Sequence, residues 1–434
     1  MSEILQKGTT IPVLYSEPLT IEAYLGGGGQ GDVYRVKYNG QDRALKWYKK
    51  GAISDPRMFY DNLKENVNRG TPNEAFLWPI ALTEWVDGTF GYVMELKPDG
   101  YYEMTEFVLK NVCFPTFKRA IDAALNIVLA FRILHNQGYS YQDLNDGNFF
   151  INPRNGDVLI CDNDNVAPNG VQTGILGKPR YMAPEIVMRK NMPNTQSDRH
   201  SMAVIIFMLL CLNHPLEGKR SIGPVLTPEK QELLFGAMAT FMMDPENNDN
   251  GPDLKIHSNA VLIWDCLPDY MRDIFEKAFS HKALLENPNS RPVEIDWIEV
   301  LVRFRSDIAQ CSCGNEVFVS QGKTKTCEKC GKEPYVPVYL ELPDYSIPGM
   351  ADTRIFKCQT CFCDAEEALS PIARVVVSKD DPQKLGLKNA SDQIWNAVTS
   401  KGKERKVQPK EVIPMKPGIR FTCNNSEIKI TKNA

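Results

Sequence analysis

Apolar residues form several long runs in the middle of the chain. Residues 121–135 and 201–212 are strongly apolar and predict two buried helices. The second run is far shorter than the roughly 20 residues needed to cross a bilayer, so we interpret it as a core helix. Residues 264–279 have an amphipathic helical pattern, and residues 227–243 also look helical. The middle of the chain is therefore expected to be mainly α-helical.

Shorter apolar runs toward both ends of the chain predict strands. Residues 43–47 and 91–96 read as strands, with a helical segment at residues 55–69 between them. Near the C-terminus, short β-branched runs alternate with turns rich in Gly, Pro and Asn, and this regular spacing favours a small β-sandwich. These C-terminal runs comprise residues 335–340, 373–377 and 419–422.

Composition and charge narrow the possible classes of function. A length of 434 residues suggests two or three domains, and 43% hydrophobic content can build sizeable cores. The net charge of −4 gives no reason to expect nucleic acid or an anionic membrane as a partner. No apolar run follows Met1, so we expect no secretory signal and a cytoplasmic location.

Three polar residues form the set that phosphoryl transfer from Mg-ATP requires. Asn148 follows Asp143 by five residues, and Asp162 follows it by nineteen. One carboxylate can orient an acceptor hydroxyl, while the Asn and the second carboxylate hold Mg²⁺ against the phosphates. With Ala183-Pro184-Glu185 downstream, the sequence resembles the eukaryotic-type protein kinases and their H-R-D, D-F-G and A-P-E signatures. The resemblance implies a bilobal α+β kinase fold that uses ATP with Mg²⁺ or Mn²⁺.

The nucleotide-binding parts of such kinases occur upstream and in the expected order. Glycines allow backbone amides to approach phosphate oxygens, and the family's glycine loop carries them in a G-x-G-x-x-G-x-V pattern. Lys46 stands where the family has the lysine that grips the α- and β-phosphates. The resemblance implies that Met94 borders the adenine pocket and that the backbone near Glu95 binds the base. The loop pattern is formed by Gly26, Gly28, Gly31 and Val33.

Other family positions extend the resemblance over residues 21–305. Glu65, on the predicted helix, is expected to pair with Lys46 and position it, with Asp61 one turn earlier as the alternative. Asp198 is expected to brace the backbone of the catalytic loop. Arg291 is expected to pair with Glu185 of the A-P-E motif and thereby anchor the activation segment.

Several residues depart from the family pattern. Asn145 replaces the Lys that steadies the transferring phosphoryl group, and Lys178 stands where many serine/threonine kinases have Thr. Asn163 and Asp164 replace the Phe and Gly of D-F-G, which is expected to place a second carboxylate near the metal. A Gln precedes Asp143 in place of Arg, so activity is not expected to depend on phosphorylation of the activation segment, where Thr173 is the main candidate hydroxyl.

The groups that contact the nucleotide, the metal and the acceptor are all kept, which favours an active kinase. We predict a serine/threonine protein kinase in which Asp143 orients the acceptor hydroxyl and helps to deprotonate it. The alternative is a nucleotide-binding pseudokinase scaffold that recruits partners through its C-terminal modules, a hypothesis favoured by Asn145 and Asp164. Transfer to a small molecule is disfavoured, because Glu185 and Arg291 belong to parts that organise a peptide-binding platform.

Two close cysteine pairs beyond the kinase region indicate a metal site. A glycine follows each pair and permits the tight turns that aim two sulfurs at one point. Four thiolates at about 2.3 Å satisfy a tetrahedral Zn²⁺, and such a closed shell is structural. Two disulfides are the alternative, which a reducing cytoplasm disfavours. The predicted zinc ribbon uses Cys311, Cys313, Cys327 and Cys330.

The remaining tail holds a second cysteine cluster. Cys358, Cys361 and Cys363 could form a second metal site with Cys423, although ordinary free thiols are equally plausible. Residues 385–421 weakly resemble forkhead-associated domains, which bind phosphothreonine through positioned Arg and Ser side chains. A degenerate domain that docks a partner, or the kinase itself, is the alternative.

Together these patterns predict four parts and a set of partners. The resemblance to bacterial kinases encoded beside phosphatases and von Willebrand-type domains implies protein substrates and a partner of one of those two kinds. The predicted parts are an N-lobe at residues 1–98, a C-lobe at 99–306, a zinc ribbon at 307–334 and a small β domain at 335–434.

Overall fold

The computed structural model describes residues 4–171, 177–223, 225–319, 326–378, 381 and 384–432, so Thr173 lies outside the described residues. The chain divides into two compact units. The first comprises Met1–Pro115 and Asn126–Val293, and the second comprises Thr116–Leu125 and Glu294–Ala434. Among the described residues, no helix combines the length and hydropathy that crossing a membrane requires.

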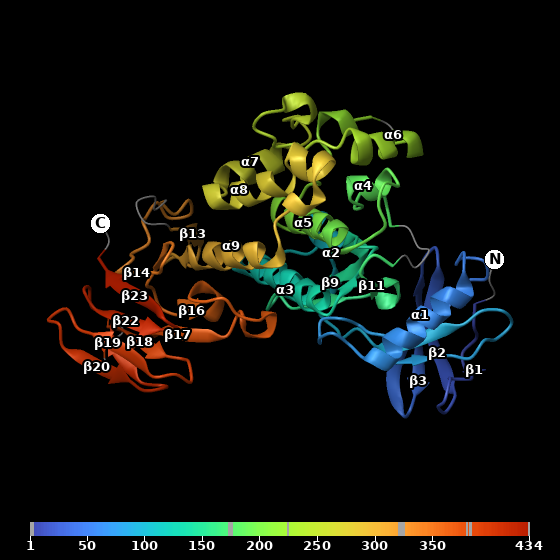
Figure 1. Ribbon diagram of the computed structural model, residues 1–434, viewed down its shortest axis with the longest axis horizontal. Helices are drawn as coiled ribbons and strands as arrows, with labels where there is room; N and C mark the ends of the chain where they lie inside the picture. Colours follow the sequence, from blue (N-terminus) through green and yellow to red (C-terminus); the bar gives the residue numbers. More distant parts are fainter. Residues whose placement is uncertain are drawn as a thin grey trace. The chain divides into compact units, whose positions relative to one another are not determined.

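The first unit begins with an antiparallel sheet of six strands in the order β1-β2-β3-β4-β6-β5. Helix α1 (Pro56–Arg69) runs alongside these strands (Figure 1) and packs Phe59 and Leu63 into the same core as Tyr92. Asp55 caps the helix by accepting a hydrogen bond from the backbone N–H of Met58 at 3.0 Å. The predicted strands and helix of this region are confirmed. The strands are β1 (Thr10–Ile11), β2 (Leu19–Gly27), β3 (Gly31–Tyr38), β4 (Gln41–Tyr48), β5 (Ala81–Leu82) and β6 (Gly91–Glu95).

Helices dominate the rest of the first unit, and one of them, α3, begins in residues that belong to the second unit. The two apolar runs form α3 and α5, as predicted. Residues 264–279 do not form one helix, because Pro268 has no N–H to continue the ladder and separates α7 from α8. Residues 227–243 are helical only in part. The helices are α2 (Met104–Val108), α3 (Phe117–Asn136), α4 (Pro184–Val187), α5 (Thr195–Cys211), α6 (Pro228–Glu232), α7 (Ser258–Cys266) and α8 (Asp269–Ala278).

Short strands frame the loops between these helices. Strands β9 and β10 form a hairpin that β7 extends, and β8 pairs with β11. The β9–β10 hairpin separates two predicted metal ligands along the chain. Asn148 directly precedes β9, and Asp162 follows β10 after one residue. The strands are β7 (Tyr102–Glu103), β8 (Tyr139–Ser140), β9 (Phe149–Ile151), β10 (Val158–Ile160) and β11 (Ala167–Pro168).

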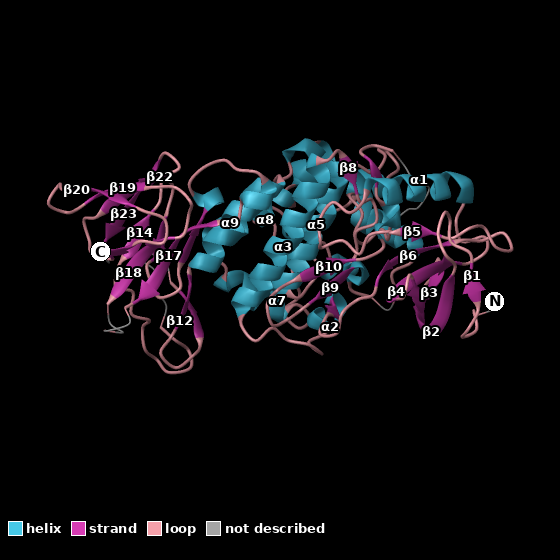
Figure 2. Cartoon of the chain, turned by 90° about the horizontal axis from the view of Figure 1, so that it is seen from below, coloured by secondary structure: helices cyan, strands magenta, loops and turns pink. Residues whose placement is uncertain are grey.

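The second unit is rich in strands, which Figure 2 shows in magenta. After α9 (Glu294–Ser306), β12 (Ile308–Gln310) pairs with β13 (Glu316–Phe318), and two larger sheets follow in the orders β15-β14-β23-β22-β19-β20 and β16-β17-β18-β21. Both sheets contribute to one hydrophobic core, for example through Trp395 and Val375. The strands are β14 (Tyr339–Glu341), β15 (Ser346–Pro348), β16 (Arg354–Phe356), β17 (Pro371–Val377), β18 (Leu385–Asn389), β19 (Trp395–Val398), β20 (Glu404–Val407), β21 (Val412–Pro414), β22 (Arg420–Cys423) and β23 (Ser426–Thr431).

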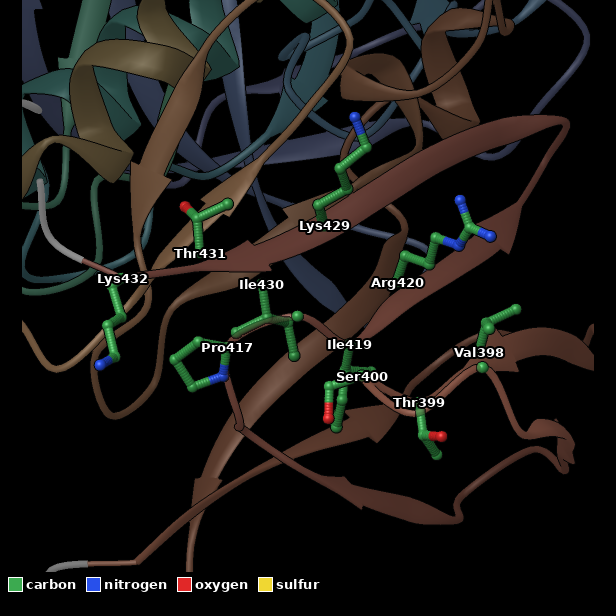
Figure 3. Close-up of a pocket in the computed structure, with 12 residues that line it drawn as sticks. Val398, Thr399, Ser400, Pro417, Ile419, Arg420, Lys429, Ile430, Thr431 and Lys432 are labelled. Atoms are coloured by element: carbon green, nitrogen blue, oxygen red, sulfur yellow. The ribbon is translucent and has the colours of Figure 1, made fainter.

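One end of these sheets holds a pocket of about 510 Å³ (Figure 3). Its lining includes the cationic side chains of Arg420 and Lys429 and the hydroxyl of Ser400. Glu427 lies 3.6 Å from the Arg420 guanidinium and 3.9 Å from the Lys429 ammonium, so part of the positive charge is compensated.

Candidate active site

The loop that carries Asp143 is held in place by one buried carboxylate. Asp198, near the start of α5, accepts hydrogen bonds from the backbone N–H groups of Tyr141 at 2.6 Å and Gln142 at 3.1 Å. Its Oδ2 also lies 3.0 Å from Nε2 of His135. The predicted bracing role of Asp198 is therefore confirmed, and His135 serves the same structural cluster.

Asp143 presents a carboxylate oxygen that is ready to accept a proton. Its Oδ1 is buried and has no hydrogen-bond partner among the described residues. A Cβ on Gly177 would lie 2.9 Å from that oxygen, so a larger residue there would push the Asp143 carboxylate aside. Burial and the negative charge of Asp162 raise the pKa of Asp143 to about 7, against the opposing effect of Lys178. A carboxylate with a pKa near neutrality suits a general base.

Asn148 and Asp162 come together beside this loop, as a shared metal requires. The Asn148 side-chain oxygen accepts a hydrogen bond from the N–H of Asn145 at 3.1 Å, which fixes the amide. Its nitrogen lies 3.5 Å from Oδ2 of Asp162. The Asp162 side chain is 43% exposed, so its carboxylate is open to an incoming ion. The open Asp162 carboxylate is a hard oxygen donor of the kind that Mg²⁺ takes alongside substrate phosphates. In this structure the Asn148 amide turns its nitrogen, and not its oxygen, toward that carboxylate.

Lys46, in the middle of β4, is paired with two carboxylates. Its Nζ lies 3.0 Å from Oδ1 of Asp162 and 2.7 Å from Oδ2 of Asp164. Burial opposes the charge of Lys46, but Asp162 and Asp164 outweigh it and raise its pKa well above the usual value. Asp164 is fully buried and also accepts a hydrogen bond from the Tyr48 hydroxyl. Its carboxylate therefore faces Lys46 and Tyr48. The expectation that Asp164 places a second carboxylate near the metal stays a prediction.

The expected pairing of Lys46 with Glu65 is not the one that the structure has. Glu65 and the alternative, Asp61, are both exposed on α1. The side of α1 that faces the segment after Asp162 carries Asn62 and Asn66, which each donate a hydrogen bond to the carbonyl of Val166, at 3.0 and 2.9 Å. Helix α1 therefore presents neutral amides toward the segment after Asp162, because the carboxylates of Asp61 and Glu65 are on its exposed face.

The glycine loop connects β2 to β3 directly above the strand that carries Lys46. The Gly28 N–H donates to the Gly31 carbonyl at 2.8 Å and closes the turn. A Cβ on Gly31 would lie 2.6 Å from the Trp47 carbonyl, so only glycine allows this close approach to β4. A Cβ on Gly26 or Gly28 would meet no atom within 4 Å, which leaves space beside the loop. Val33 lies opposite Lys46 in the sheet register.

The adenine side of the predicted site follows β6. Met94 is buried in the core that lies behind the sheet, opposite Ala44 of β4. Glu95 ends the strand with an exposed side chain that pairs with Arg43 at 2.7 Å. The backbone beyond Glu95 thus leaves the sheet where the resemblance places the contacts to the base.

Two residues near the site were not predicted to act there. The Nζ of Lys178 donates to Oδ1 of Asn145 at 3.1 Å, so a cation reaches the catalytic loop from the activation segment. The hydroxyl of Tyr48, which is on the same strand as Lys46, donates a hydrogen bond to Asp164. The sequence did contain a signal for Lys178. The chain lacks the usual family Lys at position 145 and has a Lys at position 178, where many serine/threonine kinases have Thr. Nothing in the pattern of β4 marked Tyr48 as more than a core residue.

The ion pair expected to anchor the activation segment is present and buried. Arg291 donates two parallel hydrogen bonds to Glu185, each of 2.7 Å. It also donates to the carbonyls of Ala283 at 3.1 Å and Gln196 at 2.9 Å. This predicted pair is confirmed.

Four cysteine sulfurs form a compact group in the second unit. The Sγ atoms of Cys311, Cys313, Cys327 and Cys330 all lie within 4.8 Å of one another, with two contacts of 3.5 Å. Any two sulfurs of a regular zinc tetrahedron are about 3.8 Å apart, so the group fits the ion. Gly314 and Gly331 adopt the positive φ angles that the turns require. Burial opposes ionisation of Cys327, but the N–H groups of Cys330 and Lys329 lower its pKa to about 6.

The second cysteine cluster does not gather in the same way. Across the described part of the chain, the cysteine tetrad is the only group of three or more metal-ligating side chains close enough to share an ion. The sulfurs of Cys358, Cys361, Cys363 and Cys423 do not form such a group.

Comparison with known proteins agrees with this geometry. Residues 19–291, more than half of the chain, match the family model described as protein kinase domain. The probable serine/threonine-protein kinase MARK-C of Dictyostelium discoideum is 25% identical over 51% of this chain. The serine/threonine-protein kinase pkn3 of Myxococcus xanthus is 24% identical over 50%. The matches cover only 30% and 41% of those two relatives. The chain belongs to the protein kinase family.

Proposed function

We propose that the protein transfers the γ-phosphate of Mg-ATP to serine or threonine hydroxyls of protein substrates, with its own hydroxyls among the acceptors to be tested. The observation that carries the proposal is the assembly of Lys46, Asp143, Asn148 and Asp162 around one site, although they come from separate parts of the chain. The confirmed Glu185–Arg291 pair supports a protein substrate, because it anchors the segment that a peptide would contact.

Each residue has a distinct task in this reaction. Mg²⁺ held by Asn148 and Asp162 would neutralise phosphate charge, and Lys46 would contact the α- and β-phosphates. Asp143 accepts the proton of the acceptor hydroxyl as that oxygen bonds to the γ-phosphorus, while the bond to the ADP oxygen breaks. The glycine loop would cover the phosphates, and the backbone near Glu95 would bind the base.

The direct test is transfer of labelled γ-phosphate from ATP, with Mg²⁺ or Mn²⁺, to the protein or to a generic protein acceptor. Incorporation at Ser or Thr supports the proposal. Nucleotide binding without any transfer would instead favour the pseudokinase scaffold.

Lys178 is expected to supply the charge that Asn145 lacks, because its ammonium reaches Asn145 and acts electrostatically on Asp143. We expect Lys178→Met to lower kcat by about 10-fold while the KM for ATP changes little. The double variant Asn145→Lys, Lys178→Thr returns the cation to its usual family position, and it should recover most of that loss. Steady-state kinetics decide the matter: an unchanged kcat in Lys178→Met would contradict this role.

The cysteine tetrad supports a second proposal, a structural zinc site in a zinc ribbon. Its four thiols leave no position for substrate, so the ion would hold the fold and not take part in catalysis. The surrounding core is small, with Ala309, Val317 and Val336 among its members. Binding of the ion would therefore supply most of the folding free energy of this segment, on the order of 10 kcal/mol.

We expect Cys327→Ser to release the zinc and expose the segment around it to protease, without lowering the melting temperature of the kinase region. Elemental analysis and limited proteolysis of the full chain measure both effects. Cys266→Ser is the matched control, because Cys266 is exposed and outside the tetrad. Zinc retained at one ion per chain in Cys327→Ser would contradict the site.

The C-terminal sheets support a docking role, through a β-sandwich that resembles forkhead-associated domains. The shared core of the two sheets, and the pocket whose lining includes Arg420 and Ser400, support this assignment. A partner phosphatase or von Willebrand-type protein, and a cytoplasmic location, stay predictions from the sequence.

A further inference from the structure

The lysine that would contact the nucleotide phosphates has an unusual anionic partner. We propose that Asp164, and not a carboxylate of helix α1, is the residue that positions Lys46. This inference rests on the proposed function, since it concerns how Lys46 is held for the nucleotide. Asp164 is a positioning residue, because it acts through Lys46 and touches neither nucleotide nor acceptor.

The contact between Lys46 and Asp164 is short and shielded from water. The Nζ–Oδ2 distance is 2.7 Å, and the two side chains are 7% and 0% exposed. The same carboxylate oxygen accepts the hydroxyl of Tyr48, which comes from the same strand as Lys46. A buried ion pair keeps its geometry only when further hydrogen bonds satisfy its members, and Tyr48 supplies one of them. One oxygen of Asp164 is therefore held by both Lys46 and Tyr48, while its other oxygen is buried without a partner among the described residues.

The second partner of Lys46 is suited to a different task. Asp162 is 43% exposed and places its other oxygen beside Asn148, where Mg²⁺ would bind. If Asp162 were the only anion near Lys46, the ammonium and the metal would compete for one carboxylate. Asp164 removes this competition, because it neutralises Lys46 from the buried side and leaves Asp162 open toward the metal.

Helix α1 contributes to this arrangement without charge. Asn62 lies 3.5 Å from the carbonyl of Asp164 and 3.0 Å from that of Val166, and Asn66 donates to the same Val166 carbonyl. These amides hold the backbone of the segment that carries Asp164. Glu65 is exposed, and the partners of Lys46 are Asp162 and Asp164.

The test uses Asp164→Asn, Glu65→Gln, Lys46→Met and the double variant Lys46→Met, Asp164→Asn in the full chain. We expect Asp164→Asn to lower kcat/KM for ATP by about 100-fold, as misplacement of a positioning group does. It should also raise the Mg²⁺ concentration needed for half-maximal activity, since Lys46 then turns to Asp162. Glu65→Gln should stay within about twofold of wild type, as exposed charges do. The double variant should be no worse than Lys46→Met alone.

The opposite pattern overturns the proposal: a loss in Glu65→Gln as large as in Asp164→Asn, or an Asp164 effect that adds in full to Lys46→Met. A role in folding alone would lower the melting temperature without changing the Mg²⁺ dependence, and this too overturns it. If Asp164→Asn fails to fold, Tyr48→Phe replaces it, with an expected loss of about 10-fold that disappears in the Lys46→Met background.

Failure of the proposed function has a different signature. If the wild type transfers no phosphate, that function is wrong. The wild type and the same four variants are then compared by their affinity for Mg-ATP. A non-additive loss of affinity in Asp164→Asn and Lys46→Met still supports the positioning role. Fully additive losses overturn it.

Discussion

Asp143→Asn is expected to reduce phosphoryl transfer by a factor of about 10² to 10⁴, the usual contribution of a general base. The amide keeps the shape of the side chain but cannot accept the hydroxyl proton. Affinity for Mg-ATP should stay close to wild type, because Asp143 is not among the groups proposed to hold the nucleotide or metal. Labelled phosphate transfer measures the first effect and equilibrium nucleotide binding the second. Transfer at the wild-type rate would refute the assignment of Asp143 as the base.

The same substitution should stabilise the fold at neutral and higher pH, which provides an internal check. The folded-state pKa of Asp143 is about 7, above its value in the unfolded chain. The unfolded chain therefore loses this proton first, and stability falls as pH rises from about 4 to about 7. Asn carries no such penalty, so the metal-free variant should gain roughly 4 kcal/mol over wild type at pH 8 and almost nothing at pH 4.

Thermal unfolding in EDTA at the two pH values separates this effect from general changes in packing. A gain of the same size at both pH values would show that the carboxylate is not responsible. A gain in stability only at the higher pH, together with loss of phosphoryl transfer, would show that the ionised Asp143 carboxylate destabilises the fold and is needed for the reaction.

Arg291→Met is expected to destabilise the first unit by about 3–5 kcal/mol, because it leaves the Glu185 carboxylate buried without its cation. Arg291 is 3% exposed and Glu185 6%, so water cannot easily replace the lost partner. The carbonyls of Ala283 and Gln196 lose a donor as well. Denaturant or thermal unfolding with Arg291→Met measures the cost.

Two controls make this prediction specific to a buried charge. The double variant Glu185→Met, Arg291→Met removes both charges and should be less destabilised than Arg291→Met alone. Lys37→Met breaks the exposed pair with Asp42 and should leave stability unchanged within error. If the double variant is less stable than Arg291→Met, then lost packing explains the effect, and not a buried charge without its partner.

Much of the fold could be predicted because the local signals agreed with it. Asp55 and Pro56 marked the start of α1, and the apolar runs marked α3 and α5. The break at Pro268 was also visible in the sequence, but the amphipathic pattern on both of its sides concealed it. A sequence pattern gives the type of an element more reliably than its ends.

The partner of Lys46 was harder to predict, for two different reasons. Buried positions Phe59, Leu63 and Asn66 define the inward face of α1 at helical spacing, and Glu65 is off that face. The periodicity thus contained the information needed to reject Glu65. Asp164 lies 118 residues from Lys46, and only the folded chain shows that its carboxylate points to the lysine and not to the metal side of Asp162.

Asn163 has a consequence for the design of inhibitors. Its buried amide nitrogen donates to the carbonyls of Leu77 and Ile160, at 2.9 Å each. A compound that binds by displacing this segment must offset two buried hydrogen bonds, at a cost of about 1–3 kcal/mol for each group left unpaired. Screening libraries for this protein should therefore favour compounds that leave the segment after Asp162 in place.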